Sequence, residues 1–403
     1  MGWVKVLGDK NKALTQQSDG KLLTADDTAN QHLANIATTL TGSTNQQNMA
    51  TINALPIKNI TTKQPKTALR FKSILNTNNT TAYTVGEDGY LYIIKGVVQR
   101  IKDVSDGSLI ETSPVTWDNA VYGFPKFIAV FSDGTLSVVC KDKICHLTAW
   151  DATPTIIKTF TNPDTFIEMG CSYHDDGLNK IVLAGEYGQT PEAKSLWLSR
   201  DGGLSFASIK QSTATDGVRN SHWHTAIYDK YSGRIWASHG DFEINRGVCY
   251  SDDFGNTWTE LSGMWQPTAI VDLPNMIAFG PDLNDVKSGV IGVYRPKNET
   301  HFAVSNADFK QLFDFRGDDR ISGDFYPEAP FVNEGDTAYI VYPPRVYDDN
   351  TYIFATGDGG HSWHCVYSGK EKLFSILGYT ATGHVVAKKW VGGLVYADVI
   401  EWI

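Results

Sequence analysis

Three segments of the chain repeat one eight-residue pattern, and this repetition constrains the fold more than any other feature of the sequence. Each copy reads Ser/Thr-x-Asp-x-Gly-x-Ser/Thr-aromatic, and the copies begin at Ser199, Ser251 and Thr356. The first two starts lie 52 residues apart, and the third lies 105 residues further on, which is about twice that interval. A period of this length indicates an architecture built from one structural unit per repeat.

Two further segments lie about one period away from these copies and hold degenerate versions of the pattern. Residues 305–309 (SNADF) occupy the place expected between the second and third copies, and residues 148–151 (TAWD) begin 51 residues before the first. Neither segment keeps the glycine. The repeat therefore extends over five successive units.

The residue types of the pattern predict a structural role in a hairpin between two strands. An Asp carboxylate accepts hydrogen bonds from N–H groups of its own turn, Gly supplies a positive φ, and the terminal aromatic ring wedges between neighbouring sheets. We assign this structural role, and no catalytic one, to Asp201, Gly203, Phe206, Asp253, Gly255, Trp258, Asp358, Gly360 and Trp363.

Turn signals elsewhere in each repeat give the number of units. Candidate turns between the first and second strands fall at 87–89, 132–134, 175–177, 231–233, 274–275, 334–336 and 382–383. The last repeat is short, so we expect a strand near residues 70–74 to complete its sheet and close the ring. With 36 Gly and 12% aromatic residues, the sequence predicts an all-β propeller of four-stranded blades over residues 67–403, with seven blades preferred.

The repeated pattern resembles the Asp box of sialidases, sortilins and related propellers. This resemblance implies six blades as the alternative count, and it implies an exo-glycosidase with an arginine triad, a Tyr/Glu nucleophile pair and an acidic Asp. Sialidases carry Phe/Tyr-Arg-Ile-Pro before their first repeats, whereas this chain has Leu69-Arg-Phe-Lys72, which reverses the aromatic residue and the arginine and lacks the proline. We therefore assign no catalytic residue.

Residues 1–66 differ in composition from the rest, because Thr, Asn, Gln and Ala dominate and Trp3 is the sole aromatic residue. Residues 25–40 read as a helix with Leu33, Ile36 and Leu40 at heptad-like spacing. This apolar stripe is too thin to bury itself. Either it packs on the propeller or it associates with copies of itself, and a homotrimeric stalk is the favoured form of the second interpretation.

Charge and cysteine content exclude several classes of partner. A net charge of −10 argues against a nucleic-acid partner. Neither an apolar signal region nor a run of about 18 apolar residues is present, so we expect neither ordinary export nor membrane insertion.

The five cysteines form no CxxC pair and are expected to be buried free thiols. His222 and His224 share a face of a predicted strand, but no third ligand is specified. We predict no metal and no cofactor.

The loops that enter the innermost strands of a propeller surround its central channel, where ligands usually bind. Here those loops mix aromatic rings with charged groups, as saccharide sites do, because rings cover the C–H faces of a sugar while charged groups bond its hydroxyls. The candidate ligand-binding residues are Asp241, Trp265, Arg320, Asp324, Tyr326, Arg345 and Tyr347.

The combination of a polar N-terminal segment, a single propeller and free cysteines resembles a tail-associated receptor-binding protein of a bacteriophage. That resemblance implies a non-enzymatic protein of the virion that recognises a host cell-surface glycan. It also implies that residues 1–66 attach to other tail or baseplate proteins. The alternatives are a sialidase-like exo-glycosidase and a structural virion propeller whose faces are covered by neighbouring proteins.

Overall fold

The computed structural model divides the chain into two compact units, residues 1–67 and residues 68–403. The residues that the structure describes are 7–9, 12–16, 22–23, 69–78, 82–86, 88–102, 110–162, 165–187, 193–212, 222–240, 246–262, 267–281, 289–296, 302–314, 333–334, 336–342, 351–370, 373–380, 385–391 and 394–402.

The first unit contains a three-stranded antiparallel sheet among its described residues. Its strands are Leu7–Asp9 (β1), Lys12–Gln16 (β2) and Leu22–Leu23 (β3), with β2 in the middle. The helix predicted over residues 25–40 lies outside the described residues, and its role in trimer formation stays a prediction.

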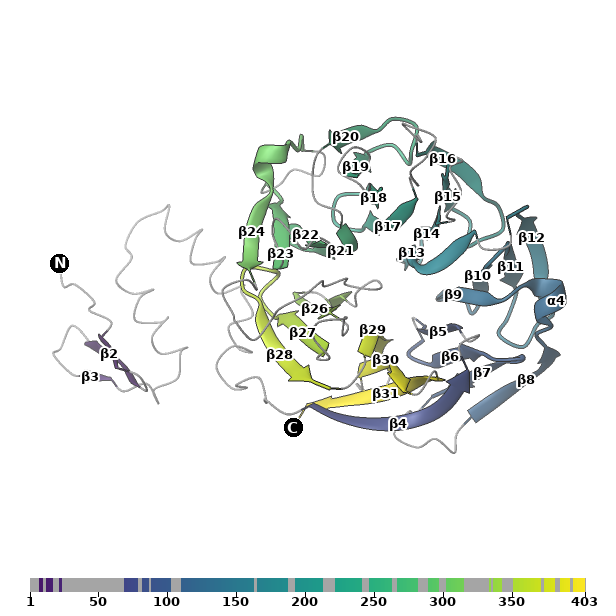
Figure 1. Cartoon of the computed structure of the whole chain (residues 1–403), viewed down its shortest axis with the longest axis horizontal. Helices are drawn as coiled ribbons and strands as arrows, with labels where there is room; N and C mark the ends of the chain where they lie inside the picture. The colour runs from purple at the N-terminus through teal and green to yellow at the C-terminus, as the bar shows by residue number, and fades with distance from the viewer. Residues whose placement is uncertain are drawn as a thin grey trace. The chain divides into compact units, whose positions relative to one another are not determined.

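The second unit is a β-propeller in which seven four-stranded antiparallel sheets follow one another around a central axis (Figure 1). We number the sheets as blades I to VII in chain order. In blades I to VI the strands are consecutive in the chain. In blades I to V the first strand lies nearest the axis (Figure 1). The all-β fold class is thus confirmed, and the preferred count of seven blades is the one that the described strands show.

Strand bounds follow the seven-unit repeat. The strands of blades I to III are Ala82–Val85 (β5), Leu91–Ile94 (β6), Val97–Ile101 (β7), Ile110–Thr116 (β8); Pro125–Val130 (β9), Leu136–Cys140 (β10), Lys143–Leu147 (β11), Thr155–Thr159 (β12); Phe166–Asp175 (β13), Lys180–Glu186 (β14), Ser195–Ser199 (β15), Ala207–Gln211 (β16). Those of blades IV to VI are Trp223–Asp229 (β17), Arg234–His239 (β18), Gly247–Ser251 (β19), Thr259–Ser262 (β20); Pro267–Leu273 (β21), Met276–Pro281 (β22), Gly289–Tyr294 (β23), Lys310–Asp314 (β24); Asn333–Glu334 (β25), Thr337–Tyr342 (β26), Thr351–Thr356 (β27), His364–Gly369 (β28).

Blade VII closes the ring with strands from both ends of the second unit. Leu373–Tyr379 (β29), Val385–Val391 (β30) and Leu394–Trp402 (β31) come from the end of the chain, and Leu69–Asn78 (β4) is added as the outermost strand. Antiparallel pairing runs from Leu394 opposite Asn78 to Trp402 opposite Leu69. This confirms the strand expected near residues 70–74. It also pairs the backbone groups along the outer edge of β31, which a three-stranded last blade would leave exposed.

Helices are short within the described residues. Asn119–Tyr122 (α4) begins after Asp118, whose carboxylate accepts a hydrogen bond from the Ala120 N–H, and Asn306–Asp308 (η1) is a single 3₁₀ turn. No helix in the described part of the chain is long and apolar enough to cross a membrane.

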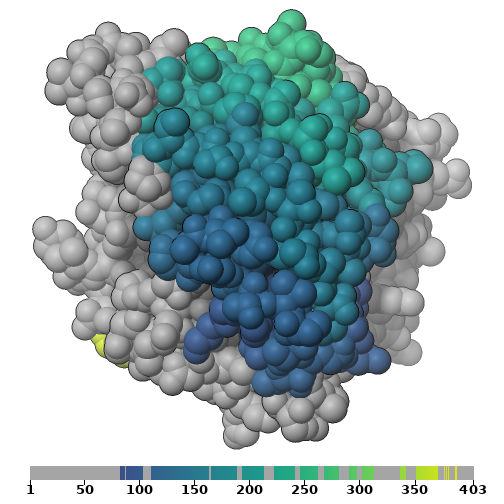
Figure 2. Space-filling model, turned by 90° about the vertical axis from the view of Figure 1, so that its right-hand side faces the viewer, coloured from purple at the N-terminus to yellow at the C-terminus, as the bar shows by residue number. Residues whose placement is uncertain are grey.

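The hydrophobic core consists of the layers between successive blades. Trp236 of blade IV packs edge-on against Phe279 of blade V, with ring centroids 5.6 Å apart, and both side chains are fully buried. A Cβ at Gly185 of blade III would stand 2.5 Å from the Cβ of Trp223 in blade IV, so this close approach of the two blades requires glycine. Viewed from the side, blades I to IV form one continuous surface (Figure 2).

Four of the five cysteines, Cys140, Cys145, Cys171 and Cys249, are buried free thiols, as the sequence predicts. Cys365 differs, because it is exposed. It lies on β28, the outermost strand of blade VI, whose outward face meets solvent.

Candidate functional site

Antiparallel strand order distributes the connections of every blade between two faces. Turns between the first and second strands and between the third and fourth strands lie on one face, which we call the box face because the three Asp boxes lie there. Loops between the second and third strands, and those that lead to the next blade, lie on the other, which we call the loop face.

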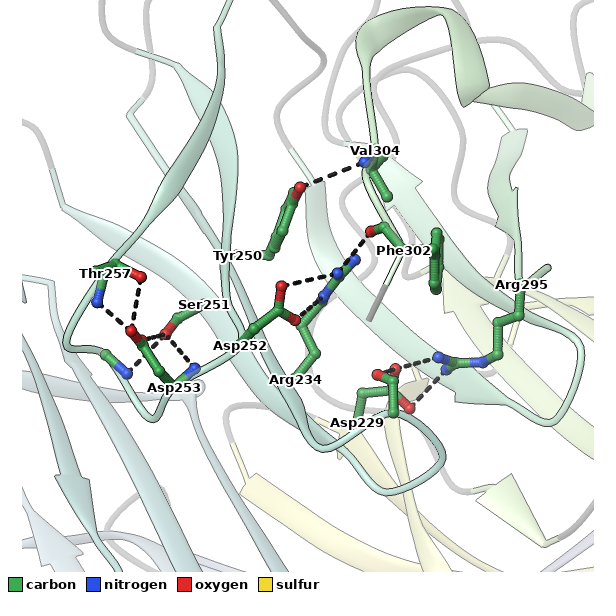
Figure 3. A network of polar contacts seen from close by, with 12 residues as sticks. Asp229, Arg234, Tyr250, Ser251, Asp252, Asp253, Thr257, Arg295, Phe302 and Val304 are labelled. Atoms are coloured by element: carbon green, nitrogen blue, oxygen red, sulfur yellow. Dashed lines mark hydrogen bonds and ion pairs between the residues drawn. The ribbon is translucent and has the colours of Figure 1, made fainter. Parts of the chain in front are cut away.

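The three boxes share one set of hydrogen bonds. In blade IV, Asp253 Oδ1 accepts from the Ser251 hydroxyl at 2.8 Å and from the Thr257 N–H at 2.8 Å, and Oδ2 accepts from the Thr257 hydroxyl at 2.7 Å (Figure 3). Asp201 and Asp358 accept the same bonds in their own turns. Burial opposes the ionisation of Asp201 and Asp358, yet the hydrogen bonds lower the pKa of all three carboxyls. These carboxylates therefore act within their own hairpins.

The glycines of the boxes combine a positive φ with a close approach to the preceding blade. Gly203, Gly255 and Gly360 have φ values of 89°, 90° and 95°. A Cβ at Gly255 would lie 2.5 Å from the Cβ of Ile209 in blade III, and the other two glycines likewise face side chains of the preceding blade. Only glycine meets both requirements.

The box aromatics lie between the blades. The indole N–H of Trp258 donates to the carbonyl of Gly255 at 3.0 Å and to that of Ile209, in blade III, at 3.1 Å. Trp363 is buried against residues of blade V, and Phe206 packs against residues of blade II. Each box thus fixes its own turn and its contact with the neighbouring blade.

Phe254 departs from the box geometry that glycine provides elsewhere. It occupies the position of Gly202 and Gly359 and takes a φ of 56°, which is rare for a residue with a Cβ. Its ring stacks nearly parallel to that of Tyr228, with centroids 5.9 Å apart. The guanidinium of Arg200, a residue of the preceding box, lies 3.8 Å from the centroid of the Phe254 ring. These contacts offset the unfavourable backbone conformation.

The two degenerate segments occupy the equivalent turns of their blades. Residues 148–151 join β11 to β12, and residues 302–309 lead from β23 to β24. In the second segment Asp308 accepts hydrogen bonds from the N–H and the hydroxyl of Ser305, both at 2.8 Å. An Asp therefore still caps the turn although the glycine is lost.

Two arginines that sequence reasoning did not single out hold the box face of blades IV and V together (Figure 3). Arg295, which follows β23, forms a two-pronged ion pair with Asp229 at the end of β17, with Nη2 2.6 Å from Oδ1. Arg234 pairs with Asp252 in the same way, at 2.7 and 3.1 Å, and also donates to the Phe302 carbonyl at 2.7 Å. The side chains of Arg234 and Arg295 are 1% and 7% exposed, so their ion pairs serve the packing of strands and blades.

Asp272 is the carboxyl on this face with the most perturbed ionisation. Asp272 lies on β21, and the backbone N–H of Lys230 in blade IV donates a hydrogen bond to its Oδ2 at 3.4 Å. Burial raises its pKa to about 7, and the neighbouring charge of Asp229 adds to the shift against the opposing charge of Lys230. This carboxyl changes its charge near neutral pH.

Two histidines lie at the loop-face end of β17, the first strand of blade IV. His222 and His224 are buried, and their Nε2 atoms lie 2.8 Å apart, so one ring donates to the other. The Tyr187 ring lies against His222 at a tilt of 36°, with centroids 3.9 Å apart. The two histidines thus share one face of the chain, as predicted, and they are engaged with each other.

A second cluster of polar side chains, with one histidine, lies further from the axis on the same blade. His239, Cys249 and Glu260 bring Nε2, Sγ and a carboxylate oxygen within 4.8 Å of one another. Burial opposes the ionisation of Glu260, but hydrogen bonds from His239 and from Lys210 lower its pKa to about 2. Among the described residues this set matches the donor atoms of a metal site, and the sequence analysis missed it because the three residues lie on different strands.

The seven candidate ligand-binding residues all lie outside the described residues. They are Asp241, Trp265, Arg320, Asp324, Tyr326, Arg345 and Tyr347. In the chain they belong to segments that follow β18, β20, β24 and β26, which are the connections of the loop face. The structure does not bring them together or separate them, so their role stays a prediction.

Four of the described arginines are engaged within the framework of the propeller. Arg100 pairs with Glu111, Arg200 stacks on Phe254, and Arg234 and Arg295 form the buried ion pairs above. In the part of the chain that the structure describes, these guanidinium groups are therefore used for packing and pairing between strands and blades.

Comparisons with known proteins show no family for this chain. No protein-family model and no curated protein matches the chain. Three solved structures that it resembles are a GH74 xyloglucanase from Xanthomonas campestris (TM-score 0.46, 13% identity, covering 81% of this chain and 54% of that one), a GH74 enzyme from Niastella koreensis (0.49, 14%, 79% and 52%) and a sialidase from Trypanosoma rangeli (0.42, 12%, 83% and 60%). This chain thus matches between about half and 60% of the length of each. The assignment of the fold rests on the strand pairing described above.

Proposed function

We propose that the propeller binds a host cell-surface saccharide through its loop face and does so without catalysing a reaction. The observation that supports this most is the use of polar groups on the opposite, box face. There the box carboxylates bond to their own turns, and Arg234 and Arg295 bond to carboxylates that fix the blades. The box face therefore serves the framework, and the loop face is the candidate for recognition.

The loop-face segments have the residue types that a saccharide site uses. Trp265, Tyr326 and Tyr347 supply planar rings, and Arg320 and Asp324 supply groups that bond hydroxyls. A binding protein needs only such rings and hydrogen-bond partners, whereas a glycosidase also needs an acid and a nucleophile at fixed positions.

The setting we propose is the tail of a bacteriophage, with residues 1–66 attached to other tail or baseplate proteins and the chain assembled as a homotrimer. The separate compact unit that ends at residue 67 is compatible with an attachment role. Several weak saccharide sites on one oligomer give firm adsorption by avidity. Deletion of residues 1–66 should abolish incorporation into particles, and unchanged incorporation would contradict this part of the proposal.

The binding proposal is tested on an array of bacterial cell-surface polysaccharides with the full chain and single variants. Trp265→Ala and Tyr326→Ala should each weaken binding about tenfold or more, because the loss of a stacked ring removes about 1.4 kcal/mol. Tyr294→Ala is the matched control, since Tyr294 is an exposed ring at the box-face end of β23. Equal loss in all three variants, or no loss in the first two, would contradict the proposal.

A further inference from the structure

Three ligating atoms from three neighbouring strands converge on one face of blade IV. The strand register places Cys249 opposite both Ala237 and Glu260, and His239 lies two residues beyond Ala237, so the three polar side chains share a face. His239 Nε2 lies 3.6 Å from Glu260 Oε2, and all three ligand atoms lie within 4.8 Å of one another.

These separations suit a single bound ion. Zinc bonds of about 2.0–2.3 Å in a tetrahedral arrangement place ligand atoms about 3.3–3.6 Å apart. The distance between His239 and Glu260 already has this value. Cys249 Sγ lies within 4.8 Å of both other ligand atoms, so an approach of about 1 Å would complete the set. Because imidazole, thiolate and carboxylate together favour zinc, we propose that His239, Cys249 and Glu260 form a binding site for a divalent transition metal ion of the Zn²⁺ class.

Neighbouring residues orient the proposed ligands in the way that outer-shell groups of metal sites do. Lys210 of blade III contacts Oε1 of Glu260 at 2.5 Å, whereas His239 faces Oε2, so an ion can replace the contact between His239 and Glu260 without displacing Lys210. The Trp223 ring meets His239 edge-on with centroids 5.2 Å apart. Gly247 pairs with His239 across the strands, and a Cβ there would stand 3.3 Å from Nε2, so glycine leaves room beside this nitrogen.

Charge and exposure are compatible with ion entry from one side. The Cys249 thiol is buried, while the Glu260 side chain is 48% exposed, so an ion enters past the carboxylate. Binding replaces the thiol proton, which is released to solvent, and the thiolate and the carboxylate then balance the two charges of the ion. Three protein ligands leave a fourth position for water or a further ligand.

A titration of the full chain with Co²⁺, which reports zinc sites by its absorption, tests the proposal. A cobalt–thiolate bond produces a charge-transfer band in the near ultraviolet that histidine and carboxylate ligands alone do not produce. The wild-type chain and Cys365→Ser, a control at the exposed thiol, should both show the band, and Zn²⁺ should displace the cobalt. Cys249→Ser should abolish the band.

A second variant keeps the test decisive if Cys249→Ser fails to fold, which circular dichroism would reveal. Glu260→Gln retains a hydrogen-bond partner for Lys210 at a partly exposed position and should weaken Co²⁺ binding by more than about tenfold, since even the loss of an outer-shell group has an effect of that size. Absence of the band in wild type, its survival in a folded Cys249→Ser, or unchanged affinity in Glu260→Gln would overturn the proposal.

Discussion

The ion pair between Arg295 and Asp229 provides a quantitative test of how the blades are held together. Asp229 is fully buried and Arg295 is 7% exposed, so Arg295→Met leaves a carboxylate without its countercharge in the interior. Breaking a buried pair in this way destabilises a protein by about 3–5 kcal/mol. The Tyr231 N–H still donates to Asp229 at 3.0 Å, which favours the lower half of that range.

This cost converts into a melting temperature. The unfolding entropy of the second unit, residues 68–403, is about 0.7 kcal/mol per kelvin, so a loss of about 3–4 kcal/mol in Arg295→Met should lower Tm by about 4–6 °C in differential scanning calorimetry. The control is Glu111→Gln, because the side chains of the Arg100–Glu111 pair are 24% and 45% exposed and such pairs contribute at most about 1 kcal/mol.

The double variant Arg295→Met/Asp229→Asn removes the stranded charge and should be more stable than Arg295→Met alone. A Tm for Arg295→Met no lower than that of Glu111→Gln would refute the assignment of Asp229 and Arg295 as a buried link between blades IV and V.

Two further predictions concern single residues of the box face. Gly255→Ala should destabilise the chain by about 2–4 kcal/mol in urea denaturation, because φ is 90° and the new Cβ would lie 2.5 Å from Ile209. Gly134→Ala is the control: φ is 84° and the space around it is open, so only the unfavourable backbone conformation should lower stability, by about 1–2 kcal/mol. Equal losses in the two variants would contradict the packing role of the box glycine. Burial raises the pKa of Asp272 from 3.8 to about 7, so the stability that its protonated form contributes is present below about pH 4 and is lost as pH rises to about 7. Asp272→Asn should therefore gain stability relative to wild type over that interval, on the order of 2–4 kcal/mol, and a parallel pH dependence of the two proteins would show that Asp272 ionises normally.

Local, repeated signals made the fold predictable from the sequence. In the boxes at Asp201, Asp253 and Asp358 the hydrogen bonds of the aspartate stay within one turn, so the local sequence predicts the geometry of that turn. The strand at residues 70–74 was predictable because the last repeat lacked one strand, and a propeller must close.

Contacts between distant residues were not predictable in the same way. Arg295 meets Asp229 across 66 residues, and nothing in either local sequence announces the partner. His239, Cys249 and Glu260 share a face only because of the exact pairing of β18, β19 and β20, which a shift of one residue would abolish. The candidate saccharide-binding residues were predicted from loop composition alone, and they lie outside the described residues.

The central claim, that the chain binds a saccharide and leaves it intact, is tested most directly by one equilibrium measurement. The full chain is incubated with a polysaccharide that it retains on the array, and the bound and free saccharide are then analysed by mass spectrometry. We predict that the saccharide is recovered with its original mass distribution after many binding half-lives. Accumulation of shortened chains or released terminal sugars, lost in Tyr326→Ala but not in Tyr294→Ala, would contradict the claim and identify the loop face as a hydrolytic site.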